Sequence, residues 1–332
     1  MNQALSRAQP TERGACSLPA VNGGRVKVIV AVCTHQRNGP LRVLLEALVR
    51  VAQETSGRAE LGVLVVDDNP DKRAQEVAVH FKDSFALGLH LRWSGAQNIS
   101  RARNLAIGAA SELGDWVAMI DDDCEPEPSW LLSFLEVIDR TGADCVTGPM
   151  HLRVPVGTAP WLSDQPFFDD LRFDLVDGQP MEVAATNNSM ISAQFLRSNR
   201  GLQFLPELGQ IGGEDMVFYR SAAQLGLRIR FAKHAGVWGN EPVERATLRH
   251  QVRYRFWLGN SEAVTNRIIP GTSPLRLFVR GMRRFAMAVV RPGRRILRGQ
   301  RPQWRYCLAS LAGATGLMLG ALGVRRSHPQ DL

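Results

Sequence analysis

The fold is decided by the stretch Trp116-Val117-Ala118-Met119-Ile120-Asp121-Asp122-Asp123. Five consecutive apolar residues predict a short strand that is buried on both faces, as in a parallel sheet covered by helices. Because side chains alternate along an extended chain, Asp121 and Asp123 can address the same ligand. Carboxylate oxygens suit Mg²⁺ or Mn²⁺. The alternative is an acidic turn that caps a helix beginning near Trp130.

The same pattern of an apolar run followed by polar residues occurs twice earlier in the chain. Residues 26–32 predict a buried strand that leads into Thr34-His35-Gln36-Arg37, and residues 61–66 predict another that ends in Asp67-Asp68-Asn69-Pro70. Helical spacing in residues 41–51 lies between them. Strand, helix and strand begin a doubly wound sheet, which binds ligands outside the carboxyl ends of its strands. An Asx turn is the alternative explanation for Asp-Asn-Pro.

The rest of the first 240 residues continues this alternation. Strands are predicted at residues 89–93, 145–147, 183–191 and 229–231, and helices at residues 100–113 (capped by Ser100), 130–138 and 216–225. Residues 151–177 lack periodicity and predict a mobile loop over a site. We therefore expect an α/β protein with a Rossmann-like, doubly wound, mostly parallel sheet flanked by helices.

A third acidic motif, Gly212-Gly213-Glu214-Asp215, precedes the helix predicted at residues 216–225. Glycines let the backbone approach a ligand closely, and a carboxylate at a helix N-terminus is stabilised by the helix dipole. Asp215 can then act as a general base toward a hydroxyl group. Capping of the helix by an acidic pair is the alternative.

In this order the motifs resemble the family 2 inverting glycosyltransferases, which have the GT-A fold. The resemblance extends over residues 26–261. The residues that carry it are Thr34, Arg37, the Asp67-Asp68 turn, Ser100-Arg101-Ala102-Arg103-Asn104, Asp121 and Asp123, Asn187-Asn188, and Gly212-Gly213-Glu214-Asp215. Agreement over this length is much more specific than any single motif.

The resemblance implies a role for each motif. Nucleotide binding is expected at Thr34, Arg37, Asp67, Asp68, Arg103, Asn104, Asp121 and Asp122. Asp121 would lie on the ribose side and share the metal, Mn²⁺ or Mg²⁺, with Asp123. Asp215 would be the catalytic base, with Glu214 beside it. Acceptor or diphosphate contacts are expected at Asn187, Asn188, Gly213 and Arg253. The donor would be a nucleoside-diphosphate sugar, and the acceptor a saccharide or a lipid-linked molecule.

The chain departs from the family pattern after the last predicted strand. Many members have a histidine there, whereas this chain reads Val237-Trp238-Gly239-Asn240-Glu241-Pro242. Glu241 or His234 would have to substitute for it. Further along, Arg245, Arg249, Arg253 and Arg255 recur at helical spacing. One or two of them could clamp a diphosphate, and the others could form a solvated or lipid-facing basic surface.

Charge is distributed unevenly along the chain. The net charge is +8, but residues 245–332 hold 17 Lys and Arg against 2 Asp and Glu, which leaves the first 244 residues with a balance of −7. This tail predicts helices at residues 248–264 and 275–290, the second broken at Pro292-Gly293. Residues 307–324 are apolar but rich in Gly, Ala and Ser. We expect them to lie at a membrane interface or to pack on the domain.

Three regions are therefore expected. They are a disordered lead at residues 1–24 with neither a signal peptide nor an anchor, a GT-A catalytic domain at 25–242, and a basic helical extension at 243–332 that contacts an anionic membrane surface. The 5 cysteines show no CxxC pairing, which indicates a reduced compartment. Together these features favour a cytoplasmic protein held peripherally at the inner face of the plasma membrane.

Two other functions are weighed against transfer of a sugar. A nucleic-acid-binding protein would explain the pI of about 9.8, but it leaves the acidic strand ends unexplained, so no specific nucleic acid is expected. A phosphoryl-transfer enzyme could use the aspartate cluster, but the sequence has no Walker-type glycine loop. The residues therefore favour a glycosyltransferase that makes surface polysaccharide or glycolipid.

Overall fold

The core of the protein is a mixed β-sheet. The computed structural model describes residues 25–167, 174–269 and 272–327, so the lead predicted at residues 1–24 lies outside the described part. Within that part the main sheet has eight strands, in the order β3-β2-β1-β4-β9-β6-β10-β8. These are β1 (Val26–Thr34), β2 (Ala59–Asp67), β3 (Leu89–Trp93), β4 (Trp116–Ile120), β6 (Cys145–Thr147), β8 (Pro180–Met181), β9 (Asn188–Ser192) and β10 (Ile229–Phe231).

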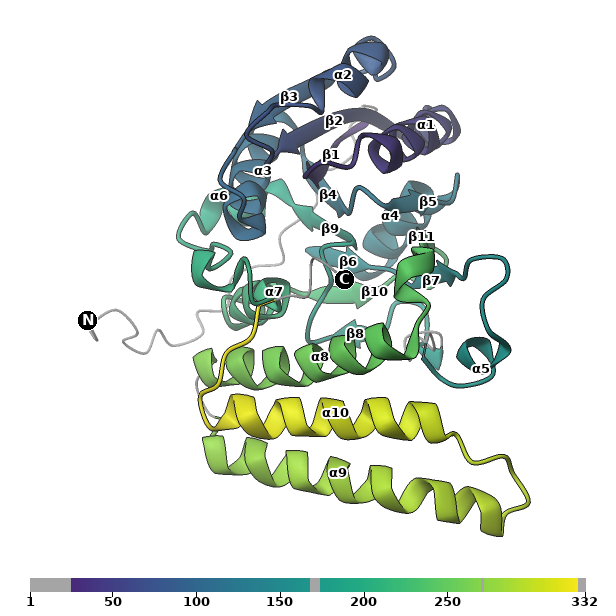
Figure 1. Cartoon of the computed structure of the whole chain (residues 1–332). Coiled ribbons are helices and arrows are strands. Elements are labelled where there is room, and N and C mark those ends of the chain that lie inside the picture. The colour runs from purple at the N-terminus through teal and green to yellow at the C-terminus, as the bar shows by residue number, and fades with distance from the viewer. Residues whose placement is uncertain (1–24, 168–173, 270–271, 328–332) are drawn as a thin grey trace.

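The first half of the sheet is parallel, as the sequence predicts. β3, β2, β1 and β4 all run in one direction, and β9 runs antiparallel to both β4 and β6. Helices cover both faces (Figure 1). They are α1 (Asn38–Thr55), α2 (Gln75–Ala78), α3 (Ile99–Leu113), α4 (Trp130–Thr141), α6 (Ala193–Ser198) and α7 (Glu214–Gln224), with the short helices η1 (Val79–Phe81) and η3 (Pro206–Leu208). The expected fold class is confirmed.

The apolar run of β1 explains why this strand is central. Val28, Val30 and Val32 point into a core shared with α1 and α4. Ile29 and Ala31 point into a second core, shared with α3 and α7. Because successive side chains of a strand face opposite sides, a strand buried on both faces must be apolar at every position. Because β2, β1 and β4 are parallel neighbours, their carboxyl ends meet at one edge of the sheet.

A second, smaller sheet escaped the sequence prediction. It has the order β5-β11-β7 and is formed by β5 (Cys124–Pro126), β11 (Val237–Asn240) and β7 (Met150–Arg153). The loop predicted at residues 151–177 thus contains most of β7 and the short helix α5 (Pro160–Ser163), and 168–173 lie outside the described residues. Strands of three or four residues carry too little periodicity to be detected without their partners.

The start of α3 and the end of α9 are among the helix boundaries that differ from the prediction. α3 is capped by Asn98, whose side chain accepts a hydrogen bond from the Arg101 amide, while Ser100 is buried inside the first turn. α9 (Pro274–Leu297) continues through Pro292 instead of breaking there. Pro292 is buried. A proline inside a helix removes one hydrogen bond and crowds the carbonyl four residues before it, so the packing of α9 must offset this cost.

The basic extension is a layer of three long helices. α8 (Leu248–Ile268) follows the short η4 (Val243–Arg245) and lies against the α/β domain. α10 (Trp304–Ala321) lies between α8 and α9, which is the outermost helix (Figure 1). Residues 307–324 therefore pack on the protein, which was one of the two expectations for them. Within the described residues, no helix combines the length and apolarity needed to cross a bilayer.

Glycines explain the composition of α10. A Cβ added at Gly259 of α8 would lie 1.9 Å from the Gly313 carbonyl oxygen, and one at Gly316 would lie 2.0 Å from the Phe256 carbonyl oxygen. The two backbones are therefore in direct contact, which only residues without a side chain allow. The Gly- and Ala-rich composition of residues 307–324 reflects this close packing.

The side chain of Asn188 links α4 to the backbone at Pro149 and Ala235 in the centre of the fold. Its Oδ1 accepts a hydrogen bond from Trp130 Nε1 at 2.8 Å, and its Nδ2 donates to the carbonyls of Pro149 and Ala235 at 2.9 and 2.8 Å. The side chain is fully buried. The sequence placed Asn188 among the acceptor or diphosphate contacts. Its amide group is instead used within the protein, where it joins α4 to two turns.

We expect Asn188→Ala to lower the free energy of unfolding by about 3 kcal/mol or more, because three buried polar groups lose their partner. Asn38→Ala is the matched control, since Asn38 makes its hydrogen bonds to Arg73 and Glu76 at the surface. Urea denaturation followed by circular dichroism measures both variants. Equal midpoints for the two would contradict the role given to Asn188.

Candidate functional site

The polar residues after β1 hold two of the three aspartates that follow β4. Thr34 Oγ1 donates a hydrogen bond to Asp122 Oδ2 at 2.7 Å. Arg37 Nη1 donates to Asp123 Oδ2 at 2.7 Å and to Asp122 Oδ1 at 3.2 Å. Asp122 is buried, whereas the Asp123 side chain is 34% exposed. The edge residue Asp123 is therefore accessible, and Asp122 is part of the support beneath it.

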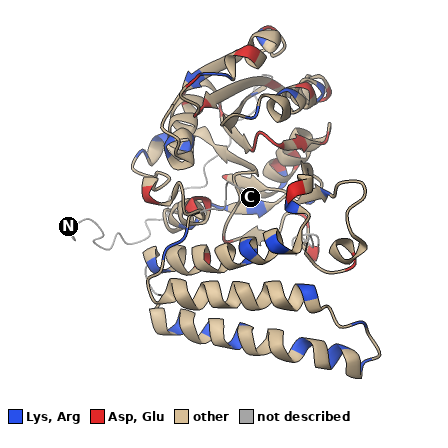
Figure 2. Cartoon of the chain, in the orientation of Figure 1, with Lys and Arg blue, Asp and Glu red and all other residues tan. Residues whose placement is uncertain are grey.

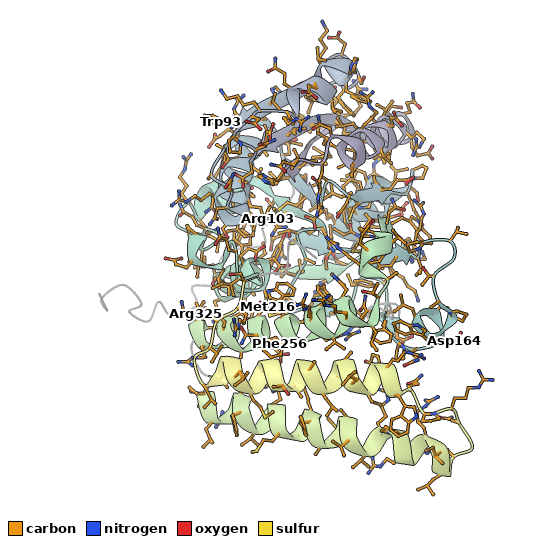
Figure 3. The ribbon with its side chains drawn as sticks, in the orientation of Figure 1. Trp93, Arg103, Asp164, Met216, Phe256 and Arg325 are labelled. Carbon is orange, nitrogen blue, oxygen red and sulfur yellow. The ribbon has the colours of Figure 1, made fainter. Side chains whose placement is uncertain are left out.

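Arg103 links the sheet edge to the third acidic motif. It lies on α3, and its guanidinium contacts Glu214 at the start of α7 and donates to Asp121 Oδ1 at 3.2 Å (Figure 3). The arginine is 8% exposed and Glu214 is 6% exposed. Segments separated by about a hundred residues are thus joined by one buried cation, which places the Gly-Gly-Glu-Asp motif beside the aspartates of β4.

Asp215 lies in the first turn of α7, and its Oδ1 accepts a hydrogen bond from the Met216 amide at 2.7 Å. Gly213 is the N-cap and has φ +83°, a conformation that L side chains rarely adopt. The predicted helix start at Met216 is therefore two residues late. The glycine conformation is what turns the chain so that Glu214 and Asp215 both enter the site.

The loop before α7 is clamped by α8. Trp257 Nε1 donates to the Ile211 carbonyl at 2.6 Å, and Ser261 Oγ donates to the Gly212 carbonyl at 2.8 Å. A Cβ at Gly212 would lie 2.2 Å from the Trp257 ring, and one at Gly213 would lie 2.5 Å from Thr265. Trp257, Ser261 and Thr265 share one face of α8 at intervals of four residues. The sequence analysis did not identify these three residues, because the spacing of residues along a helix does not show which loop the helix packs against.

The start of the extension borders Asp123 on its other side. A cavity of about 490 Å³ is lined by Arg37, Asp123, Glu125 and Arg245, among others. This cavity opens between α1, β5 and η4, so it adjoins the aspartates without spanning Asp68 or Asp215. Of the four arginines that the sequence places at helical spacing, Arg245 is therefore the one that lies beside Asp123. Of the others, Arg249 and Arg253 are exposed, and Arg255 donates to the Phe167 carbonyl.

The first acidic turn organises the loops around it. Both oxygens of Asp67 accept backbone hydrogen bonds, from Asn69 and Ala74, which is the Asx turn considered above. Both oxygens of Asp68 accept hydrogen bonds from the amides of Ala96 and Asn98, on the segment between β3 and α3. The two side chains are buried. Their contact with a nucleoside stays a prediction, and their observed effect is to fix the walls around that position.

Three other predicted residues differ in their placement. The amide of Asn104 is used on both sides by the Phe204 backbone, at 2.8 Å each, so the structure does not bring its polar atoms into the site. Asn187 donates to the Met150 sulfur at 2.9 Å, while its Oδ1 is buried with no hydrogen-bond partner among the described residues. His234 is exposed and acts electrostatically on Asp177, away from Asp123.

Electrostatics confirm that the carboxylates lie close together. Burial raises the pKa of Asp121, Arg103 opposes that rise, and the charges of Asp123 and Asp215 reinforce it. Burial also raises the pKa of Asp122 to about 6. Burial lowers the pKa of Arg103, but Glu214, Asp121 and Asp215 outweigh this effect and the net pKa is raised. The guanidinium therefore stays charged and serves as the common counter-ion.

Glu241 and Tyr254 complete the border of this region. Burial raises the pKa of Glu241, and the charge of Asp123 adds to the rise. Burial likewise raises the pKa of Tyr254, with contributions from Glu241 and Asp215. Of the two substitutes proposed for the missing histidine, Glu241 is the one near Asp123. Tyr254 was missed, because a single tyrosine in a basic helix gives no signal of its own.

The metal expectation rests on two carboxylates. In the part of the chain that the structure describes, no group of three His, Cys, Asp or Glu side chains is arranged to hold a metal ion. The Asp121 and Asp123 side chains are 41% and 34% exposed. Two accessible carboxylates fit Mg²⁺ or Mn²⁺ where phosphate oxygens and water supply the other ligands. The residues fit the ion, and its presence stays a proposal.

Comparison with known proteins places this chain in a family. Residues 29–199 match the family model described as glycosyl transferase family 2. The chain is 29% identical over 234 residues to the succinoglycan biosynthesis protein ExoM of Rhizobium meliloti strain 1021, which covers 70% of this chain and 72% of the relative.

Solved structures show the same fold. S. aureus TarS 1–349 in complex with UDP has a TM-score of 0.52 and 15% sequence identity, covering 88% of this chain and 90% of that one. The same protein in complex with UDP-GlcNAc has a TM-score of 0.52 and 14% identity, covering 89% and 90%.

We expect Arg103→Met to lower the free energy of unfolding by about 3–5 kcal/mol near pH 8, because it leaves Glu214 buried without its counter-charge. Burial raises the pKa of Glu214, and Arg103 is the main opposing influence. Its removal therefore leaves the folded state binding more protons than the unfolded state, so stability should fall as the pH rises above the unfolded pKa.

Denaturation of this variant between pH 5 and pH 8 measures the effect. Arg103→Met/Glu214→Gln is the control, since it removes the buried charge together with its partner and should show a flatter pH profile. If Arg103→Met had the same pH profile as this double variant, Arg103 would not be the counter-ion of Glu214.

Proposed function

Because the chain belongs to glycosyl transferase family 2, we propose that it transfers a sugar from a nucleoside-diphosphate donor to a hydroxyl acceptor with inversion. The observation that carries this proposal is the buried bridge from Glu214 through Arg103 to Asp121. It brings Asp215, which follows Glu214 at the start of α7 and is suited to act as a base, close to the aspartates suited to hold the metal ion of a diphosphate. The match to the family favours sugar transfer over phosphoryl transfer or nucleic-acid binding.

The donor would lie along the carboxyl edge of β2, β1 and β4. Asp67 and Asp68 hold the loops around the nucleoside position through backbone hydrogen bonds, and each oxygen keeps a second lone pair for a base or ribose donor. Thr34 and Arg37 fix Asp122 and Asp123 beneath the diphosphate. This is the ligand position that a doubly wound sheet favours.

Asp215 would be the general base. It accepts the proton of the acceptor hydroxyl, whose oxygen attacks the anomeric carbon on the face opposite the diphosphate. A bond forms between that oxygen and the anomeric carbon, and the bond from the carbon to the diphosphate oxygen breaks, so the configuration inverts. The N-terminus of α7 favours negative charge at Asp215. The clamp made by Trp257 and Ser261 keeps the preceding loop in place.

Asp123, with Asp121, would hold Mn²⁺ or Mg²⁺. When bound there, the ion neutralises the charge that develops on the departing nucleoside diphosphate. Both carboxylates are accessible, and each is also paired with an arginine, Arg37 or Arg103. These arginines keep the carboxylates oriented and reduce their mutual repulsion.

The acceptor would be a saccharide, free or lipid-linked. The relative from Rhizobium meliloti is named for succinoglycan biosynthesis, which supports a role in polysaccharide synthesis. Two oxygen atoms suit hydroxyl recognition. They are Glu214 Oε2 and Asn187 Oδ1, both buried and without a hydrogen-bond partner among the described residues. An unsatisfied buried oxygen is costly unless a donor reaches it, and sugar hydroxyls are such donors.

We expect Asp215→Asn to reduce kcat by about 10²–10⁴-fold while leaving donor affinity within about threefold, because only proton removal is lost. Single-turnover transfer from a radiolabelled donor and isothermal titration with the nucleoside diphosphate measure the two quantities. The control is Asp83→Asn, whose side chain is 87% exposed and far from the site in the fold. Unchanged turnover in Asp215→Asn would remove this residue from the mechanism.

We further expect a nucleoside diphosphate, with UDP as the first to be tried, to raise the Tm more with Mn²⁺ than with EDTA, since a ligand that binds only the native state stabilises it. Asp123→Asn should abolish that difference and keep a smaller shift with the nucleotide alone. Wild-type shifts that were identical with Mn²⁺ and with EDTA for every diphosphate tested would argue against a metal at Asp123.

A further inference from the structure

The outermost helix, α9, uses little of its surface to pack on the protein. Its buried residues are Leu277, Gly281, Ala288 and Pro292, which share the side that faces α10. A Cβ at Gly281 would lie 2.5 Å from the Met318 side chain, which marks this as the packed side. Most of the remaining circumference of this 24-residue helix, which is about 36 Å long, is exposed.

One exposed side of α9 is apolar. At 100° per residue, six of its large apolar side chains fall on one arc and are between 46% and 89% exposed, whereas Met287, which is 51% exposed, falls outside it. We call this arc the apolar strip, and it consists of Leu275, Val279, Met282, Val289, Val290 and Leu297. Trp304, at the start of α10 and 61% exposed, lies just beyond the end of α9. Contiguous exposed apolar surface of this kind marks a contact site.

The next arc of the same helix is basic. We call it the arginine row, and it consists of Arg276, Arg280, Arg283, Arg284, Arg291, Arg294 and Arg295. Figure 2 shows this helix with Lys and Arg and without Asp or Glu. In the sequence, residues 263–330 contain no acidic residue. Glu262 of α8 pairs with two arginines of the row, Arg280 and Arg284, at 3.5 and 2.5 Å.

The apolar strip and the arginine row lie next to each other on α9, and together they indicate which kind of partner this helix binds. A second copy seated on the apolar strip would bring two arginine rows to one interface, where Glu262 of each copy is already paired with its own Arg280 and Arg284. A nucleic acid would satisfy the arginines through its phosphates but would leave the apolar strip against water or phosphate. A bilayer with anionic headgroups offers phosphates to the arginines and an acyl boundary to the apolar residues.

We propose that α9 lies flat in the headgroup region of an anionic bilayer, with its apolar strip toward the acyl chains and its arginine row on the lipid phosphates. Trp304 adds an aromatic side chain of the type enriched at that depth. Since α8 and α10 join α9 to the loop at Gly212, the bilayer would hold the whole catalytic domain at a fixed height. The proposal concerns attachment alone and does not depend on the donor or the base.

Flotation of the full chain with vesicles tests the proposal. Phosphatidylcholine vesicles with phosphatidylglycerol should bind the protein, and binding should weaken as salt is added, while pure phosphatidylcholine vesicles should bind much less. Arg276→Gln/Arg283→Gln should weaken binding about 25-fold, at about fivefold per arginine. Val279→Gln/Val289→Gln, which leaves the charge unchanged, should weaken it about tenfold or more.

Matched controls separate the helix from general surface effects. Arg42→Gln/Arg200→Gln removes two exposed arginines of the catalytic domain, and Leu225→Gln replaces an apolar residue of the same domain that is 53% exposed. Both controls should bind vesicles as the wild type does. None of the changes touches the packed side of α9, so thermal unfolding should be the same in all variants.

Three results would overturn the proposal. One is that the α9 variants bind anionic vesicles as well as the controls do. Another is sedimentation showing a dimer of the wild type that becomes a monomer in Val279→Gln/Val289→Gln, which would assign the strip to a second copy. The third is duplex DNA displacing the protein from anionic vesicles at equal phosphate concentration, which would assign the row to nucleic acid.

Discussion

The guanidinium of Arg103 is the interaction on which the site depends. It is nearly buried, contacts Glu214 and donates to Asp121, and so it joins α3, the end of β4 and the start of α7. A buried charge without partners is very costly, and each of these three charges needs the others. The carboxylates of two distant motifs can therefore lie side by side in a folded protein only because this cation lies between them.

The basic extension also helps to position the candidate site. Trp257 and Ser261 of α8 hold the backbone at Ile211 and Gly212, which sets where α7 begins. α8 in turn is pressed against α10 through Gly259 and Gly316, and α10 carries α9. A rigid path of packed helices thus connects the outer basic surface to the loop before Asp215. A region that looks separate by charge is structurally continuous with the catalytic domain.

The sequence predicted the parts of the fold that carry a local signal. Continuous apolar runs identified β1, β2 and β4, because a strand buried on both faces must be apolar throughout. The acidic strand ends were also found, because clustered carboxylates repel one another and therefore indicate a ligand or a counter-ion. The small sheet of β5, β11 and β7 was missed because its strands are defined by pairing across the chain, which no local window contains.

The structure brings the predicted acidic residues of β4 and α7 close together, whereas two of the predicted amides are used elsewhere. Asn188 and Asn104 matched the family motifs, yet both amides are used to hold other segments of the backbone. Tyr254 and Trp257 went unnoticed because their positions depend on how α8 docks, a long-range event. Pro292 was taken as a helix break, but its burial against the neighbouring helix outweighs one lost hydrogen bond.

A crystal structure with a nucleoside diphosphate and Mn²⁺ bound tests the central claim most directly, namely that the three acidic motifs surround one ligand. The account predicts an anomalous manganese peak within coordination distance of Asp123, a nucleoside against the Asp67-Asp68 turn, and Asp215 facing the outer phosphate. A nucleotide bound with the aspartates of β4 on one side and Asp215 lining a separate cavity would contradict it.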